Sequence, residues 1–303
     1  MNLLVTGAWQ DAEAYMDELE AMGHSAVFLK WEKDPLPCEA EWVEGVICNG
    51  LFLHHPIERF PNLRFIQLTS AGFDRVDMDY ASAHGIEVHN ARGVYSIPMA
   101  EFALAGVLQL YKQARFFEEN RAARRWEKHR GLLELYGKNV VVVGCGSVGS
   151  ECAKRFSAMG CHVTGVDIAV REDAAFDRML PLDGLEEALN AADVLILCVP
   201  LTDKTDGLLD KARLSLLPGS AVVVNISRGR VVDEAALAAM LHAGRLFGAV
   251  LDVFETEPLP PSSPLWDAPN TVLTPHNSFV SDGIGERLGK CVKNNLFLGE
   301  KHD

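Results

Sequence analysis

A short glycine pattern near the middle of the chain sets strong limits on its fold. Residues 144–149 read GCGSVG, which has the form G-x-G-x-x-G. The apolar run at 139–143 before it predicts a buried strand, and residues 150–159 after it predict a helix. Asp167 directly follows the next predicted strand, at 162–166. A strand, a glycine turn, a helix, a second strand and an acid in this order predict a dinucleotide-binding unit.

Each position of the pattern has an expected role. Gly144 permits the tight turn after the strand, Gly146 allows a pyrophosphate to approach the backbone, and Gly149 allows the helix to pack close to the strand. The amides around Val148 lie at the start of the helix, where the positive end of the helix dipole favours a phosphate. We therefore expect the pyrophosphate of a dinucleotide at this turn.

Asp167 bears on the choice between NAD and NADP. A carboxylate at this position accepts hydrogen bonds from the adenosine ribose and repels a 2′-phosphate. We therefore expect NAD as the cofactor. Arg171 follows shortly after and would attract such a phosphate, which keeps NADP open as the less favoured alternative.

Strand-like and helix-like runs alternate along the chain. In the first part, residues 2–6, 26–29, 45–48, 64–68 and 86–89 predict strands, and residues 11–22 and 75–84 predict helices. Residues 98–116 predict one long linking helix. Further strands are expected at 139–143, 162–166, 193–198, 221–225, 247–251 and 271–274, with helices at 150–159, 185–192, 234–243 and 282–298. This alternation predicts an α/β chain with two doubly wound parallel sheets, each covered by helices on both faces.

Length and charge narrow the class of protein further. The chain has 303 residues, which suits two domains, and its 28 basic and 42 acidic residues give a net charge of −14. So acidic a chain repels phosphate backbones, and we expect no nucleic-acid partner. One basic cluster is interpreted as a solvated helix face; it consists of Arg121, Arg124, Arg125, Lys128 and Arg130.

Apolar runs and cysteines indicate the compartment. No stretch approaches the roughly 18 apolar residues of a membrane span, and the amino terminus lacks the basic start of a secretory signal. We therefore expect no membrane partner. The seven cysteines are odd in number and form no C-x-x-C pair, which disfavours zinc and a disulfide framework. We expect no metal and a cytoplasmic location.

Polar residues follow three strands of the second part. Arg228 comes after the strand at 221–225, Glu257 after the strand at 247–251, and His276 after the strand at 271–274. Ligands of an open α/β sheet bind outside the carboxyl ends of its strands. These three side chains can therefore converge on one crevice.

The chemistry of these three side chains is complementary. A guanidinium holds a carboxylate through two hydrogen bonds, and an imidazolium gives a proton to a carbonyl oxygen. A carboxylate beside the imidazole favours its charged form. Together with hydride from a nicotinamide, such a set would reduce a 2-keto acid to a 2-hydroxy acid.

Longer motifs in a fixed order resemble the D-isomer-specific 2-hydroxyacid dehydrogenase family. Besides the glycine pattern they include CVPLT at 198–202 with Thr205, NISRG at 225–229, LDVFETEPLP at 251–260 and TPH at 274–276. In the first part, SAGFD at 70–74 and GIEVHN at 85–90 are similar to the family's substrate-side segments. Asn277 and Ser278 depart from the family, where many members have an apolar residue and a glycine.

The resemblance implies a Rossmann NAD-binding domain at 98–281 and a discontinuous, flavodoxin-like substrate domain formed by 1–97 and 282–303. It implies Arg228, Glu257 and His276 as the catalytic set, with the substrate held by Arg228, His276 and the amides around Ser70, Ala71 and Gly72. The residues implied to line the NAD site are Gly144, Gly146, Ser147, Val148, Gly149, Asp167, Val199, Pro200, Thr205, Ile226, Ser227 and Asp252. The implied substrate is a small 2-keto or 2-hydroxy acid, and the implied assembly is a homodimer.

Two other functions stay open on the sequence. An NADPH-preferring glyoxylate or hydroxypyruvate reductase would differ mainly in its cofactor. An NAD-sensing, corepressor-like binding protein on the same fold would need no proton donor, so the set of Arg228, Glu257 and His276 favours the enzyme. The residues do not identify the 2-keto acid.

Overall fold

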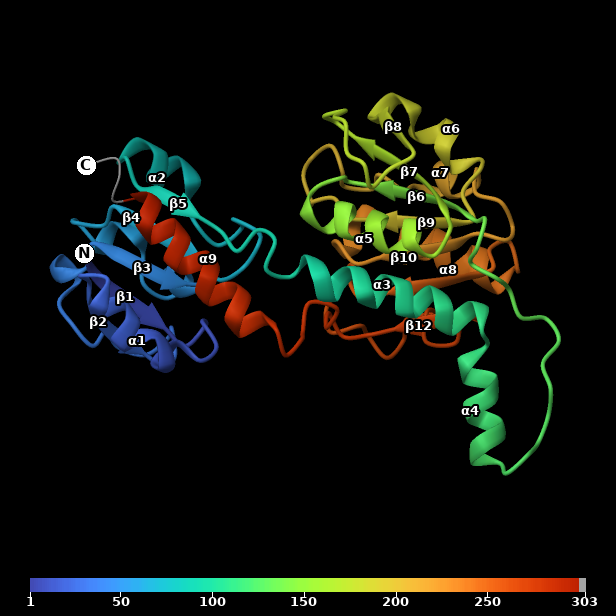
Figure 1. Ribbon diagram of the computed structural model, residues 1–303, viewed down its shortest axis with the longest axis horizontal. Coiled ribbons are helices and arrows are strands. Elements are labelled where there is room, and N and C mark those ends of the chain that lie inside the picture. Colours follow the sequence, from blue (N-terminus) through green and yellow to red (C-terminus); the bar gives the residue numbers. More distant parts are fainter. Residues whose placement is uncertain (300–303) are drawn as a thin grey trace. The chain divides into compact units, whose positions relative to one another are not determined.

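The computed structural model describes residues 1–299, and the chain divides into two compact units. The first unit consists of Met1–Tyr95 together with the chain from Ser281 onward, and the second unit is Ser96–Val280. Each unit is built around a sheet of its own (Figure 1).

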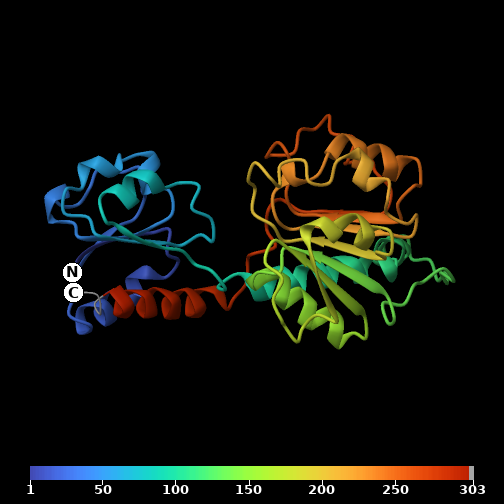
Figure 2. The same cartoon turned by 90° about the horizontal axis from the view of Figure 1, so that it is seen from above.

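The first unit has a parallel five-stranded sheet with helices on both faces. Its strand order is β2-β1-β3-β4-β5, which is the order of a flavodoxin-like fold. Helices α1 and α9 cover one face, and α2 lies on the other (Figures 1 and 2). The strands are β1 (Asn2–Thr6), β2 (Ser25–Leu29), β3 (Gly45–Cys48), β4 (Phe65–Leu68) and β5 (Glu87–His89), and the helices are α1 (Ala12–Ala21), α2 (Met78–Ala83) and α9 (Ile284–Gly299).

The second unit has a parallel seven-stranded sheet in the order β12-β11-β10-β9-β6-β7-β8. Counted within the unit, this is the doubly wound dinucleotide-binding order with one further strand at the edge. The strands are β6 (Asn139–Val143), β7 (His162–Asp167), β8 (Arg178–Pro181), β9 (Val194–Leu197), β10 (Val222–Asn225), β11 (Gly248–Leu251) and β12 (Thr271–Leu273). The helices are α3 (Ser96–Tyr111), α4 (Ala114–Ala122), α5 (Ser147–Ala158), α6 (Leu185–Leu189), α7 (Lys211–Leu214) and α8 (Glu234–His242). The predicted fold class is confirmed.

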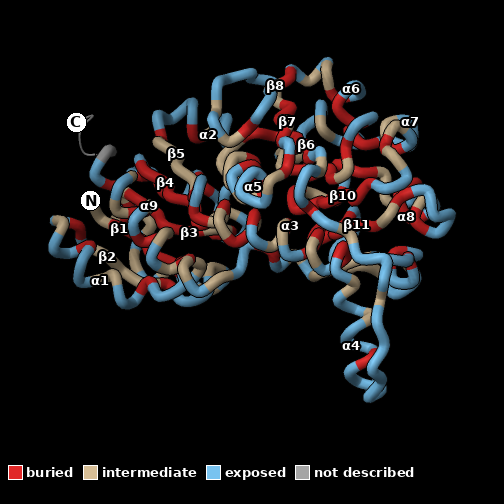
Figure 3. Tube along the Cα trace, turned by 45° about the vertical axis from the view of Figure 1, so that its right-hand side comes forward, coloured by how far each residue is buried: buried red, intermediate tan, exposed pale blue. Residues whose placement is uncertain are grey.

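The valine-rich strands of the second unit are buried on both faces. Val140 and Val142 of β6 belong to a cluster that includes α3 and α5, whereas Val141 and Val143 belong to a second cluster that includes α6, α7 and α8. Figure 3 shows buried backbone running through the sheet, with exposed segments around it. Burial on both faces explains why these strands are continuous apolar runs rather than alternating ones.

Two local predictions are wrong, and one strand was not predicted. The predicted single helix at 98–116 is two helices, because Gln113 has a left-handed backbone (φ 52°) that ends one before the other begins. Strand β8 is not predicted, since only Leu180 of its four residues is buried. The basic cluster is not one helix face: α4 ends at Ala122, and Arg124 beyond it is left-handed (φ 54°).

Within residues 1–299, every helix is too short or too polar to cross a membrane.

Candidate active site

The glycine turn lies between β6 and α5, and each glycine meets a different demand. Gly144 has a positive φ of 91°, which favours glycine. A Cβ on Gly149 would lie 2.0 Å from the carbonyl oxygen of Gly144, so helix and turn are too close for a side chain. A Cβ on Gly146 would meet no atom within 4 Å. The protein itself therefore leaves the space over Gly146 open, as a ligand that approaches the backbone requires.

The turn presents amides to that space. Helix α5 begins at Ser147, three residues earlier than the sequence predicts, and Gly146 is its N-cap. The first amides of a helix have no partner within the helix and carry the positive end of its dipole. Cys145 points the other way: its side chain is 1% exposed, and burial raises the pKa of its thiol to about 12. The turn therefore fits a pyrophosphate, and the thiol stays neutral beneath it.

Asp167 ends β7 beside this turn. One carboxylate oxygen accepts the amide of Cys145 at 2.6 Å, and the other accepts the amide of Ala169 at 3.0 Å. Arg171, which keeps NADP open in the sequence, donates a hydrogen bond to the carbonyl oxygen of Cys145. The guanidinium is thus engaged by the turn itself, and the negative charge of Asp167 lies next to the turn.

The other predicted cofactor-lining residues lie at the ends of β9 and β10. The side chain of Val199 borders the turn, since a Cβ on Gly144 would come within 2.9 Å of it. The hydroxyl of Thr205 donates to the carbonyl of Pro200 at 2.6 Å and so closes the loop after β9. Ile226 is 1% exposed, and the hydroxyl of Ser227 donates to Asn225 at 2.8 Å. The hydroxyl groups of Thr205 and Ser227 thus donate to other groups of this unit.

Asp252, at the end of β11, is fully buried and fixes the loop that carries His276. One of its carboxylate oxygens accepts the hydroxyl of Thr274 at 2.6 Å and the amide of Asn277 at 2.7 Å. The other oxygen accepts the amide of Ser278 at 2.9 Å. Asp252 therefore holds the chain on both sides of His276. The sequence motif that contains Asp252 does not by itself indicate this positioning role.

His276 itself has an uncommon left-handed backbone (φ 53°) for a residue other than glycine. Its amide donates to the carbonyl of Asp252 at 2.7 Å, and its Nδ1 lies 2.9 Å from Oε2 of Glu257. The second carboxylate oxygen of Glu257 accepts the amide of Phe254 at 3.1 Å. Both side chains are part-exposed, at 41% and 38%. The surroundings thus hold His276 in a backbone conformation that costs about 1 kcal/mol or more. In this conformation its ring contacts the Glu257 carboxylate.

Arg228 follows β10, the strand next to β11. Its Nη1 donates to the carbonyl of Ser227 at 2.8 Å, and its own carbonyl accepts the side chain of Asn225 at 3.0 Å. Gly229 places it against the next loop, because a Cβ there would lie 1.9 Å from the carbonyl carbon of Phe254. The segments that carry Arg228 and Glu257 are therefore in direct backbone contact.

One carboxylate near the catalytic set is absent from the predicted residues. Glu234 begins α8 and accepts the amide of Glu255, while its own amide donates to the Glu255 carboxylate at 3.4 Å. Burial, with the nearby charges of Glu255 and Glu257, raises the pKa of Glu234. No sequence motif marks it, since its burial depends on the loop after β11.

Ser70, Ala71 and Gly72, the predicted substrate-binding residues of the first unit, follow strand β4. Among the described residues, their three backbone amides have no hydrogen-bond acceptor. Three consecutive unpaired amides are suited to an anion.

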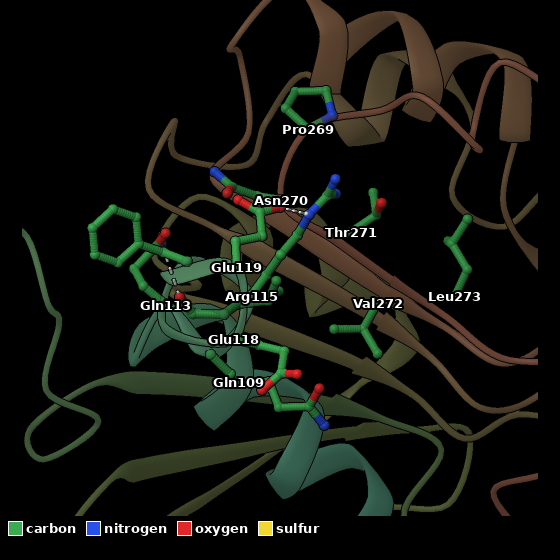
Figure 4. A pocket seen from close by; sticks show the side chains of 13 residues that line it. Gln109, Gln113, Arg115, Glu118, Glu119, Pro269, Asn270, Thr271, Val272 and Leu273 are labelled. Atoms are coloured by element: carbon green, nitrogen blue, oxygen red, sulfur yellow. Dashed lines mark hydrogen bonds and ion pairs between the residues drawn. The ribbon is translucent and has the colours of Figure 1, made fainter. Parts of the chain in front are cut away.

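A separate groove of about 750 Å³ runs along β12 (Figure 4). It is formed by the end of α3, by α4 and by residues 269–273, which include the whole of β12. Arg115 and Glu119 of α4 lie on one side, where they form an ion pair at 2.9 Å, and Asn270 and Thr271 lie on the other. None of the predicted catalytic or cofactor residues lines this groove.

Comparisons with known proteins agree with this geometry. Residues 104–278 match the family model described as "D-isomer specific 2-hydroxyacid dehydrogenase, NAD binding domain". A glyoxylate reductase of Korarchaeum cryptofilum is 33% identical over 281 residues, which are 88% of this chain and 84% of that protein. A D-3-phosphoglycerate dehydrogenase of Archaeoglobus fulgidus is 36% identical over 221 residues, which are 73% of this chain but 42% of that longer protein.

Among solved structures, a D-isomer-specific 2-hydroxyacid dehydrogenase family protein from Aeromonas salmonicida superposes with a TM-score of 0.86 at 29% identity. It covers 99% of this chain and 96% of that one. The chain therefore belongs to the D-isomer-specific 2-hydroxyacid dehydrogenase family, and its second unit contains the NAD-binding domain. The predicted family and the predicted nicotinamide dinucleotide cofactor are confirmed.

Proposed function

We propose that this protein is an NAD(H)-dependent 2-hydroxyacid dehydrogenase that works as a 2-keto acid reductase and yields the D-hydroxy acid. The observation that carries the proposal is the pair of His276 Nδ1 and Glu257 Oε2 at 2.9 Å. This pair and Arg228 follow three neighbouring strands in the unit that also holds the open glycine turn.

Arg228, Glu257 and His276 have different roles in the proposed reaction. Arg228 binds the carboxylate of the keto acid, for which a guanidinium offers two parallel donors. Because Glu257 accepts Nδ1–H of His276, the proton to be transferred lies on Nε2, which faces the keto oxygen. The contact with the Glu257 carboxylate fixes the orientation of the ring for this transfer. Bound NADH supplies the hydride to the keto carbon.

The first unit, in this proposal, is the substrate domain, and the second is the NAD-binding domain, with boundaries near 97/98 and 281/282. Ser70, Ala71 and Gly72 offer backbone amides to the substrate carboxylate from the first unit. The support is their unpaired state within the described residues, together with the family membership.

We propose NAD rather than NADP as the preferred cofactor. A 2′-phosphate would meet the charge of Asp167, and the Arg171 guanidinium already donates a hydrogen bond to the carbonyl of Cys145. Asp167→Ser tests this assignment: the ratio of kcat/KM for NADPH to that for NADH should rise. An unchanged ratio would contradict it.

The substrate class follows from the relatives and from the site together. The named relatives are a glyoxylate reductase and a D-3-phosphoglycerate dehydrogenase, so the panel of 2-keto acids includes glyoxylate, hydroxypyruvate, its phosphate ester and pyruvate. Loss of reduced-nicotinamide absorbance is measured with NADH and NADPH in parallel.

His276→Gln provides the control for the mechanism. It should abolish turnover and leave NADH binding intact, because the amide of glutamine is too weak an acid to give a proton to the keto oxygen. Turnover that survives in this variant would overturn the mechanism. Tight NADH binding by the wild-type protein, without turnover of any substrate, would instead favour an NAD-sensing binding protein.

We further propose a cytoplasmic homodimer that uses α4. Trp126, after the helix, is 98% exposed, and Arg115 and Glu119 of α4 line the groove of Figure 4. The helix and the groove thus offer apolar and charged groups to a second copy. The seven cysteines are all free, which supports a reducing compartment. Light scattering should give twice the monomer mass, and a monomer would contradict the proposal.

A further inference from the structure

We propose that Asn90 is a positioning residue that orients the substrate-binding amides of the first unit. The inference rests on the proposed function in one respect, namely that the loop at 70–72 binds the substrate carboxylate. It adds a residue to that site which does not itself touch the substrate.

Three consecutive carbonyl groups at the end of β4 are held by one short segment of chain. The carbonyl of Ala71 accepts the side-chain amide of Asn90 at 2.6 Å, and the carbonyl of Ser70 accepts the backbone amide of Ala91 at 2.8 Å. The carbonyl of Thr69 accepts the hydroxyl of Tyr95. All three donors lie between residues 90 and 95, after strand β5.

Peptide geometry converts these bonds into a direction for the amides. In a planar trans peptide the N–H points opposite to the C=O of the preceding residue. When the carbonyls of Ser70 and Ala71 point at the 90–95 segment, the amides of Ala71 and Gly72 must point away from it. These are two of the amides without an acceptor among the described residues. The segment therefore presents them to an anion.

Asn90 is the member of this set whose loss affects the loop most directly. Its bond fixes the peptide between Ala71 and Gly72, and glycine at the second position offers little resistance to rotation of that peptide. Its side chain is tied in turn, since Oδ1 accepts the amide of Arg92 at 3.2 Å. One side-chain amide thus connects the substrate loop to the backbone at 92 through both of its ends.

Two substitutions separate these connections. Asn90→Asp keeps an oxygen for the Arg92 amide but cannot donate to Ala71, and it places a negative charge beside the loop. Asn90→Ala removes both bonds. The matched control is Asn62→Ala, because Asn62 donates a similar 2.6 Å bond to the carbonyl of Glu41 and lies before β4, at the other end of the strand.

The measurements are steady-state kinetics with the best keto acid, and calorimetric binding of NADH and of oxamate to the NADH complex. Oxamate carries a carboxylate beside a carbonyl that does not accept hydride. Asn90→Ala should raise KM and the oxamate Kd about tenfold, the effect of one lost hydrogen bond. Asn90→Asp should raise both further. The Kd of NADH should not change, kcat should change much less than KM, and Asn62→Ala should match wild type.

The outcomes distinguish this inference from the proposed function. If the wild type reduces keto acids but KM and the oxamate Kd are unaltered in both Asn90 variants, the role of Asn90 is overturned and the function stands. If the wild type turns over no keto acid, the proposed function fails, and oxamate binding then tests the positioning role of Asn90. Weaker oxamate binding by the variants than by the wild type supports that role. Equal binding, or no binding to the wild type, overturns that role. Should Asn90→Ala not fold, the near-isosteric Asn90→Asp decides.

Discussion

Gly229 connects the two loops that carry Arg228 and Glu257, and Gly229→Ala tests how closely that contact controls the site. A Cβ at this position would lie 1.9 Å from the carbonyl carbon of Phe254, 2.1 Å from its oxygen and 2.3 Å from the amide nitrogen of Glu255. Non-bonded carbon atoms prefer a separation of about 3.5 Å. The two backbone segments must therefore separate by about 1.5 Å, and no flexible side chain is available to absorb the change.

This displacement should be costly for activity. A misplacement of about 1 Å in a catalytic set lowers the rate about 100-fold, which corresponds to about 2.7 kcal/mol. Overpacking of this kind also destabilises a fold by about 3 kcal/mol. We expect kcat/KM for the keto acid to fall at least about 100-fold, with a lower Tm and with NADH binding retained at a temperature where the variant is folded.

Gly219→Ala is the matched control. Its Cβ would meet only the carbonyl oxygen of Arg245, at 3.9 Å, in the same unit and on an exposed turn. This variant should be as active and as stable as wild type. Wild-type kcat/KM in Gly229→Ala would refute the reasoning, because the loops of Arg228 and Glu257 would then tolerate separation.

Two further predictions concern the same unit. Gly146→Ala should leave Tm nearly unchanged, because its Cβ meets no protein atom within 4 Å, yet it should raise the NADH Kd at least about tenfold by blocking the approach of the pyrophosphate; calorimetric titration that gives the wild-type Kd would contradict this. Glu234→Gln should raise Tm at pH 7 but not at pH 4. A carboxyl group whose pKa is higher in the folded than in the unfolded protein lowers the free energy of unfolding as the pH rises from the unfolded pKa through the folded one. Glutamine cannot ionise, and it keeps an oxygen that accepts the amide of Glu255. An equal Tm difference at both pH values would count against this assignment.

Much of the second unit could be predicted from residue patterns because its strands are buried on both faces. The valine runs of β6 and β10 mark such strands clearly, and the spacing from the glycine turn to Asp167 adds a chemical constraint. The edge strand β8 gives no such signal, because it has only Leu180 in the core. The break at Gln113 was also not predictable, since glutamine is a good helix former and its left-handed backbone depends on tertiary context.

The candidate site likewise contains residues that the sequence predicts and residues that it does not. Residues placed by strand ends, such as Arg228 and His276, follow from the topology of a parallel sheet. Residues that act through loop-to-loop hydrogen bonds do not follow from it. Asp252 is in a motif, but its three bonds to the loop of His276 depend on side-chain directions that a sequence does not specify. Asn90 needs the path of the chain after β5 for the same reason.

The discontinuous first unit has a consequence for the order of folding during synthesis. Leu3 and Val5 of β1 share a buried cluster with Leu288, Val292 and Leu296 of α9. The part of that face that α9 covers stays exposed until α9 has left the ribosome, whereas the second unit is one uninterrupted segment, Ser96–Val280. The NAD-binding unit can therefore complete its core while the unit synthesised first still lacks a helix. A nascent chain that has gained the ability to bind its cofactor thus still presents an apolar sheet face to chaperones.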